Sequence, residues 1–450
     1  MPERERPVAM AAVLRIRPFR RLWLVLAVSS IGDWMGLLAT SAFAAGRFGD
    51  PVAQGAAFGG VIAVRLLPAL IFGPLAGVLV DRFDRRATMI VCDLLRFALF
   101  ASIPVVGLLS AGPGAAVGWA AAATFLIEAV AMVWSPAKDA AVPNLVPRDR
   151  LEAANRLSLA TTYGVTPVVA ALMMAGLHGV ANLVFAGPVP AWAAPVTAAL
   201  YLNALTFLVN VVVLTVAVKE LGGRSHPAGP HPGFRRELAE AWRYVLRTGA
   251  VRGLVTGIMV AFAGTGVVIG TAERFAAAVR GDVTFPLLFA ALFAGMALGV
   301  AGGPLVVHAL SRRRWFVLSL VLAGGSVALL ALTPGPWTAA AACVGTGAGA
   351  GMAFLVGWTL LGADVGDDIR GRVFAFVEAG GRIALLVAIA VSSVLAGLGD
   401  PVPGVPAARF VLLGAGLVVV LAGCAGFRWA GDESPSPGGQ TPTARDDTRA

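Results

Sequence analysis

The chain has 450 residues, of which 58% are hydrophobic and only 13% are charged, and its formal net charge is +10. Soluble domains carry about 25% charged residues, so this composition excludes an ordinary soluble domain and indicates a protein that crosses a membrane several times. A basic surplus can also indicate nucleic-acid binding, but the arginines here cluster in short connections between apolar runs. That distribution is typical of cytoplasmic loops, so we expect no nucleic-acid partner.

Twelve apolar runs follow one another along the chain, each close to the roughly 20 residues with which a helix crosses a bilayer. The first run is longer than the roughly 7–15 apolar residues of a signal-peptide core, and many spans follow it, so we expect an uncleaved first span. The predicted fold class is an all-α polytopic membrane protein with twelve transmembrane helices. The spans are expected near residues 22–45, 54–80, 88–110, 117–134, 153–177, 195–218, 251–279, 286–310, 315–332, 337–361, 373–398 and 407–429.

Basic residues gather in alternate loops. The intervening loops carry almost none, with Arg47 and Arg280 as the exceptions. Because cytoplasmic loops hold the Lys and Arg, and because the number of spans is even, we expect both ends of the chain in the cytoplasm. The expected location is the plasma membrane of a bacterium, since the Arg-rich, Lys-poor composition is typical of a GC-rich bacterial genome. The basic loops lie at residues 82–86, 138–156, 219–250, 312–314 and 370–372.

A polar interval in the middle of the chain separates two groups of six spans. The basic turn after the second span recurs after the eighth as Arg312-Arg313-Arg314, which indicates a weak internal repeat. Two parallel six-helix halves, with the substrate near the midplane between them, are a transporter architecture. The expected domains are a cytoplasmic N-terminal segment at residues 1–21, a first half at 22–218, a cytoplasmic linker at 219–250, a second half at 251–429 and a disordered cytoplasmic tail at 430–450.

The linker is expected to contain an amphipathic helix near residues 234–248. Its apolar side chains, among them Trp242, Val245 and Leu246, fall on one helical face, and most of its charged side chains lie elsewhere. Such a helix lies along the inner membrane surface or packs on the protein. The pattern predicts both arrangements equally.

A short charged turn, Gly77-Val-Leu-Val-Asp81-Arg82-Phe83-Asp84-Arg85-Arg86, joins the second and third spans. It resembles the conserved loop motif between the second and third helices of the major facilitator superfamily. The resemblance implies that the motif locks the outward-open state, with Asp81 near the positive end of the eleventh helix, where the helix dipole favours an anion. In the second-half copy, His308 stands near the place of the acid, and Asp84 replaces the usual glycine in the first. The matching positions are Gly77, Asp81, Arg82, Arg85 and Arg86.

A second stretch narrows the resemblance. Residues 135–147, Ser-Pro-Ala-Lys-Asp-Ala-Ala-Val-Pro-Asn-Leu-Val-Pro, followed by Leu151-x-Ala153-Ala154-Asn155, resemble the macrolide-efflux and enterobactin-exporter branch of that superfamily. Arg65 and Pro68 in the second span, and Arg370-Gly-Arg-Val-Phe374 at the start of the eleventh, are further features of the branch. The resemblance covers about residues 18–429. It implies twelve helices, alternating access and proton-driven export, and it says almost nothing about the substrate.

Two carboxyl groups lie in the middle of predicted spans, where an ionisable group is costly unless it is paired or hydrated. Asp33 lies in the first span and Glu128 in the fourth, and neither has Lys or Arg within a helical turn. Each is a candidate for binding and releasing a coupling proton. Alternatively, Asp33 is a structural partner for Arg65 on the neighbouring helix, and Glu128 is a hydrogen-bonded packing residue.

The other charged residues within the spans are expected to be structural or to face an anionic group. Asp93 and Arg96 are three residues apart, and Glu378 and Arg382 are four apart, so each pair can form on one helix face. Arg65, deep in the second span, attracts an anionic group or balances Asp33.

Aromatic residues are candidates for the lining of a substrate cavity. Trp34, Phe262 and Trp358 are expected to line an apolar cavity, although anchoring at the membrane interface explains Trp358 equally well. The chain around Pro167, in the fifth span, and Gly345–Gly351, in the tenth, are candidate flexible points.

These features favour a secondary active transporter that exports a lipophilic or amphipathic small molecule in exchange for protons. Its expected partners are the lipid bilayer, a small-molecule substrate and protons. The alternative is an exporter of a siderophore or an endogenous metabolite. An enzyme is disfavoured because the loops carry no metalloprotease, phosphate-binding or nucleophile motif, and a non-transporting scaffold because it needs no intramembrane carboxyl groups. The histidines and cysteines are scattered, so we expect no metal site and no cofactor.

Overall fold

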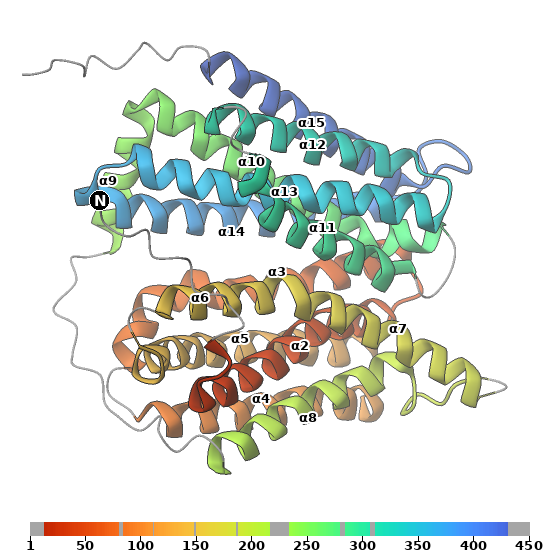
Figure 1. Cartoon of the computed structure of the whole chain (residues 1–450). Helices are drawn as coiled ribbons and strands as arrows, with labels where there is room; N and C mark the ends of the chain where they lie inside the picture. Colours follow the sequence, from red (N-terminus) through yellow and green to blue (C-terminus); the bar gives the residue numbers. More distant parts are fainter. Residues whose placement is uncertain are drawn as a thin grey trace, which may run out of the picture.

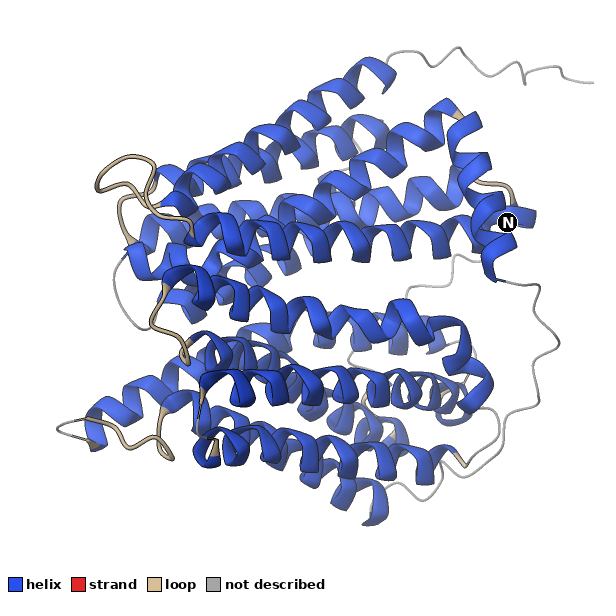
Figure 2. Ribbon diagram, turned by 180° about the vertical axis from the view of Figure 1, so that it is seen from behind, coloured by secondary structure: helices blue, strands red, loops and turns tan. Residues whose placement is uncertain are grey.

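The computed structural model describes residues 13–80, 84–110, 112–147, 150–185, 188–216, 234–279, 284–306 and 311–430. Throughout these ranges the chain consists of helices joined by short loops, as Figure 2 shows. Twelve of the helices are long and apolar enough to cross a membrane. The predicted all-α polytopic fold with twelve transmembrane helices is therefore confirmed.

The helices up to residue 216 form one bundle, drawn in red to yellow-green in Figure 1. The segments α6, η2 and α7 follow one another without a break, and η2 is a π-helical turn inside this long helix. The elements of this first half are α2 (Arg17–Ala45), α3 (Pro51–Val80), α4 (Arg85–Leu109), α5 (Pro113–Leu145), α6 (Leu151–Ala160), η2 (Thr161–Val165), α7 (Thr166–Val184) and α8 (Pro195–Val216).

The remaining helices form a second bundle beside the first (Figure 1). Because the number of spans is even, α2 begins and α15 ends at the same end of the molecule, which we call the terminal end; it lies at the left in Figure 1. The opposite end is called the far end. The elements of this second half are α9 (Phe234–Arg247), α10 (Gly249–Val279), α11 (Thr284–Val306), α12 (Arg312–Leu332), α13 (Pro336–Asp364), α14 (Asp367–Gly397) and α15 (Ala407–Ala430).

Polar residues at the terminal end fix where helices begin and end. The Asp84 carboxylate accepts a hydrogen bond of 2.9 Å from the Ala87 backbone N–H and caps the start of α4. Arg86, from the charged turn, donates hydrogen bonds of 2.9 and 2.6 Å to the carbonyls of Leu214 and Thr215 at the end of α8. A cation at a helix C-terminus is favoured by the free carbonyls and the helix dipole. Two further charged positions of the motif, Asp81 and Arg82, lie outside the described residues, so the expected lock stays a prediction.

Helix α9 packs on the terminal end of the second half. Ala241 and Val245 are buried against α10 and α14, and Arg372 at the start of α14 donates a 2.6 Å hydrogen bond to Glu240. The Trp242 ring lies 5.6 Å from that of Phe376. The predicted helix thus packs on the protein through Ala241 and Val245, while Trp242 and Leu246 of its apolar face are 51% and 45% exposed, so its contact with the membrane surface stays a prediction.

Candidate functional site

The first half holds charged side chains from neighbouring helices in its interior. Asp33 on α2 forms an ion pair with the Nη2 of Arg96 on α4. Arg96 is only 1% exposed, and its guanidinium lies 4.2 Å from the centroid of the Phe207 ring, a cation–π arrangement. Its Nη1 lies 3.9 Å from the Asp93 carboxyl, one turn away on the same helix. The three-residue spacing thus brings Asp93 to Arg96 as predicted, but the nearer partner of Arg96 is Asp33.

A second ion pair joins α3 to α5. Arg65 Nε lies 2.7 Å from Glu128 Oε1, and the two side chains are 22% and 21% exposed. The Nη1 of Arg65 also donates a 3.2 Å hydrogen bond to the backbone carbonyl of Asp33. The predicted alternative role of the Asp33 carboxyl as the partner of Arg65 is therefore wrong. Arg65 holds only the backbone of Asp33, because Glu128 approaches its guanidinium from a different helix.

These contacts link α2, α3, α4 and α5 into one charged cluster, defined as Asp33, Arg65, Asp93, Arg96 and Glu128. The cluster has three carboxyl groups and two guanidinium groups. Charged groups at this depth in a membrane protein are expected to pair with one another, and four of the five form close pairs. Within the described residues, no three His, Cys, Asp or Glu side chains are grouped as a metal site would require.

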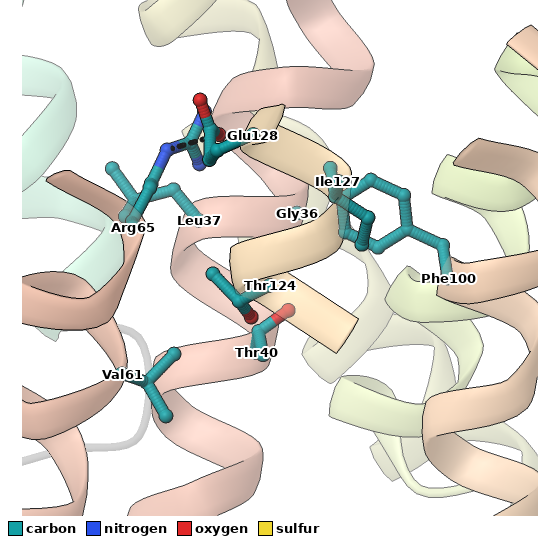
Figure 3. A pocket seen from close by; sticks show the side chains of 9 residues that line it. All are labelled: Gly36, Leu37, Thr40, Val61, Arg65, Phe100, Thr124, Ile127 and Glu128. Carbon is teal, nitrogen blue, oxygen red and sulfur yellow. Dashed lines mark ion pairs between the residues drawn. The ribbon is translucent and has the colours of Figure 1, made fainter. Parts of the chain in front are cut away.

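A small cavity lies next to the Arg65–Glu128 pair (Figure 3). Its volume of about 10 Å³ is at the lower limit of what can hold one water molecule. Thr40 and Thr124 bring hydroxyl groups to its wall, and the Thr40 hydroxyl is buried without a hydrogen-bond partner in the described part of the chain. No motif marked these threonines in the sequence; the only signal was a polar residue in each of two apolar runs. The lining residues are Gly36, Leu37, Thr40, Val61, Arg65, Phe100, Thr124, Ile127 and Glu128.

The two halves pack tightly near the far end. On α3, Gly55 and Gly59 approach Ser393 of α14 so closely that a Cβ on either glycine would collide with it. The Phe58 ring lies 5.7 Å from the Phe285 ring of α11, in an edge-to-face arrangement. Small residues permit such close approach of helices in a membrane, so the far end of the interface is closed.

Nearer the terminal end the halves separate. Glu378 and Arg382 form a 2.5 Å ion pair on α14 and are 56% and 37% exposed. By helical spacing they share a face with Ile389 and Ser393, the residues of α14 that pack on α3. The face of α14 that is buried against the first half near the far end is thus exposed around Glu378. The opening between the halves therefore faces the terminal end.

Trp34, on α2, connects the two halves near this opening. Its Nε1 donates a 2.8 Å hydrogen bond to the Thr162 carbonyl in η2. Its ring lies 4.6 Å from that of Phe293 and 6.0 Å from that of Phe289, both on α11. The π-helical turn immediately precedes Pro167, the residue that the sequence marked as a candidate flexible point. Such turns occur often at functional positions.

The other two predicted cavity residues lie within the second half. Phe262 packs against Gly381 of α14, where a Cβ would collide with its ring. Trp358 stacks on Phe374 with ring centroids 4.9 Å apart. Neither residue lines the small cavity, and their role in a substrate cavity stays a prediction.

The chain is similar to known membrane transporters. The family model described as Major Facilitator Superfamily matches residues 22–362. An uncharacterised MFS-type transporter of Mycobacterium tuberculosis is 34% identical over 159 residues, 34% of each chain. Macrolide efflux protein A of Enterococcus faecalis is 30% identical over 180 residues, 39% of this chain and 48% of the relative. The chain therefore matches less than half the length of these relatives.

The fold recurs in solved structures. The crystal structure of the nucleoside transporter NupG, in its D323A form, superimposes with a TM-score of 0.69, and the match covers 92% of this chain and 100% of that one at 13% identity. At this identity the likeness concerns the fold alone.

Proposed function

The chain belongs to the major facilitator superfamily, and we propose that this transporter exports a lipophilic or amphipathic small molecule in exchange for protons. The observation that carries the proposal is the charged cluster beside the opening between the halves. Asp33 and Glu128 are 29% and 21% exposed, so water from the opening can reach both carboxyl groups. Each is held by an arginine of a neighbouring helix.

Protonation of these carboxyl groups would change the contacts between helices. A neutral carboxylic acid no longer attracts the guanidinium, so a proton on Asp33 loosens the contact of α2 with α4, and a proton on Glu128 loosens that of α3 with α5. The halves meet through α3, which packs on α14. A shift of α3 within the first half therefore changes its packing on α14 in the closed interface at the far end. Proton binding would be coupled to alternating access in this way.

The cargo is proposed from the surroundings of the opening. The interface residues around it are mostly apolar and aromatic, including Leu37, Leu66 and Phe293, and apolar pockets with few polar groups suit lipophilic ligands. The resemblance to macrolide efflux protein A supports an exporter of such molecules. The alternative cargo, a siderophore or an endogenous metabolite, is distinguished by the transport assay.

The orientation is proposed from the basic residues at the terminal end, among them Arg86, Arg312 and Arg372, which lie at the starts of α4, α12 and α14. The positive-inside rule places this end in the cytoplasm of a bacterial plasma membrane, so the opening faces inward. A single cysteine at Arg312 should react with a membrane-impermeant maleimide only after spheroplasts are permeabilised. Labelling of the cysteine in intact spheroplasts would show that the terminal end faces outward and would contradict the proposed orientation.

The transport assay uses purified protein in liposomes with an imposed pH gradient and an internal pH dye. A panel of lipophilic drugs and siderophores is added to wild type, Asp33→Asn and Glu128→Gln. The matched control is Asp364→Asn, because Asp364 is a carboxylate that also pairs with an arginine, Arg313, at 3.1 Å, but outside the cluster. We expect one compound to dissipate the gradient in wild type and in the control, and at least tenfold more slowly in the cluster variants. If no compound moves protons in wild type, the proposed exchange is wrong.

A further inference from the structure

We propose that Asp93 is a buried proton-binding residue that shares the Arg96 guanidinium with Asp33. At any time one of the two carboxyl groups then holds a proton, and Arg96 pairs with the one that is ionised. The exchange of protons at Asp33 and Asp93, which we call the relay, rests on the proposed proton-coupled transport. The protonation of Asp93 by itself does not. The proposal differs from the purely structural Asp93–Arg96 pair that the spacing predicted.

The two carboxyl groups have different contacts with the one guanidinium. Asp33 contacts Nη2 of Arg96 directly, while Asp93 is 3.9 Å from Nη1, beyond hydrogen-bond distance. Asp33 is 29% exposed, whereas Asp93 has no exposed surface. No hydrogen bond of good geometry reaches the carboxyl oxygens of Asp93 from the described residues, and the Trp134 indole and the more distant Nη1 of Arg96 are the polar groups beside it. The direct contact of Arg96 is therefore with Asp33, and Asp93 is enclosed without a close cation.

Among the described residues, the cation whose charge acts on Asp93 is Arg96. The charged and titratable groups that face it among the described residues are Arg96 and Cys92 on its own helix and Asp33 on α2. From α5, the Trp134 indole lies beside it, and the Lys138 ammonium lies on that ring, 5.8 Å from its centroid. Helix α8 contributes the Phe207 ring, which faces Arg96.

An enclosed carboxylate without a close cation is strongly disfavoured, and such a group takes up a proton instead. The observed arrangement is therefore the one with Asp93 neutral and Asp33 ionised. When Asp33 accepts a proton from the opening, Arg96 is released and pairs with Asp93, which loses its proton. One proton is bound and one is released, so the three groups together stay electrically neutral in both forms. Neutrality in both forms suits an interior of low dielectric constant.

The two carboxyl groups lie at different depths in the bundle. Asp93 lies nearer the start of α4, and thus nearer the terminal end, than Arg96 does. Asp33 lies in the middle of α2.

Infrared difference spectroscopy on purified protein in nanodiscs tests the protonation of Asp93. At neutral pH we expect wild type to show a carboxylic-acid C=O band that disappears in Asp93→Asn. Arg96→Gln should strengthen the acid signal, because both carboxyl groups then lack a cation. Asp93→Asn should fold normally, since the amide mimics the neutral acid, and Asp93→Glu serves as a second variant that keeps the titratable group. If wild type and Asp93→Asn have the same acid bands, Asp93 is ionised and the proposal is wrong.

Proton flux in liposomes tests the relay itself. Asp93→Asn should slow substrate-driven proton flux at least tenfold, because Arg96 then stays on Asp33, and Asp93→Glu should retain flux. Unchanged flux in Asp93→Asn, together with a lost acid band, would show that Asp93 is protonated but takes no part in transport. Failure of wild type to exchange protons would instead contradict the proposed function and leave the infrared result standing.

Discussion

Asp33 on α2 and Arg96 on α4, 63 residues apart in the sequence, form an ion pair inside the membrane-spanning bundle. Arg96 is almost fully buried and faces Asp93 with its other terminal nitrogen. A single guanidinium therefore serves two carboxyl groups from two helices. Removal of the Arg96 guanidinium should therefore affect both Asp33 and Asp93.

Arg96→Gln should lower the free energy of unfolding by about 3–5 kcal/mol at pH 8, because it leaves the Asp33 carboxylate without its cation and removes the cation that lies near the enclosed Asp93. The loss should shrink as pH falls to 5, since protonated carboxyl groups need no cation. Thermal unfolding of the wild type and the variant in detergent, from pH 8 to pH 5, measures this loss of stability. Arg313→Gln is the control: Arg313 and Asp364 are 29% and 24% exposed, so that pair is expected to contribute about 1 kcal/mol or less. Equal losses in both variants at all pH values would contradict the prediction.

Gly59→Val should prevent the far end from closing, because any Cβ at Gly59 collides with Ser393 across the interface. A Cβ on the neighbouring Gly60 would meet no atom within 4 Å, so Gly60→Val is the matched control. Spin labels on exposed Ala56 and Leu398, with the native cysteines replaced by alanine, report the separation of α3 and α14.

In this experiment Gly59→Val should shift the label distance toward longer values and slow transport, while Gly60→Val should resemble wild type. Identical distance distributions in the two variants would show that the glycine contact does not control closure of the far end.

Trp34→Phe should loosen the π-helical turn while keeping an aromatic ring against Phe289 and Phe293. The lost hydrogen bond to the Thr162 carbonyl is worth about 1 kcal/mol. Amide hydrogen exchange of residues 161–166 should speed up about fivefold, as expected for that energy. Trp119→Phe is the control, because its Nε1 bonds to Ser102 at 2.9 Å, away from η2. Unaltered exchange in Trp34→Phe would mean that the indole does not restrain η2.

Glu240→Gln and Arg372→Gln should each release α9 from α14. Because these side chains are 26% and 38% exposed, the pair is expected to contribute about 1 kcal/mol or less. A double-mutant cycle on the rate of limited proteolysis next to α9 isolates this coupling. Arg243→Gln is the control, since the Arg243 guanidinium donates a 3.2 Å hydrogen bond to the Ala239 carbonyl within the same helix. Strictly additive effects of the two variants would show that the contact does not hold α9.

The membrane spans were predictable from the sequence because hydrophobic length alone defines them. The span expected at residues 54–80, for example, is α3 at Pro51–Val80. Candidate charges were equally visible, since an ionisable residue in an apolar run stands out. Their partners were not, because spacing reports only contacts within one helix: it predicted Asp93–Arg96 but not Asp33–Arg96 or Arg65–Glu128.

The π-helical turn and the small cavity depend on packing between helices. Proline at 167 marked the region but not the insertion of an extra residue in the turn before it. Thr40 and Thr124 line the same cavity only because α2 and α5 lie side by side there. Such features follow from tertiary structure, which local patterns do not encode.

In the proposed mechanism, the charged cluster couples movement of the substrate to protons. The most direct test is the equilibrium ratio of substrate across liposome membranes at zero membrane potential, measured against pH gradients of both signs. For each proton exchanged, the wild-type ratio should change about tenfold per pH unit and invert with the gradient, whereas in Asp33→Asn it should stay near one. A wild-type ratio that ignores the gradient, or an equal response in Asp33→Asn, would contradict the account.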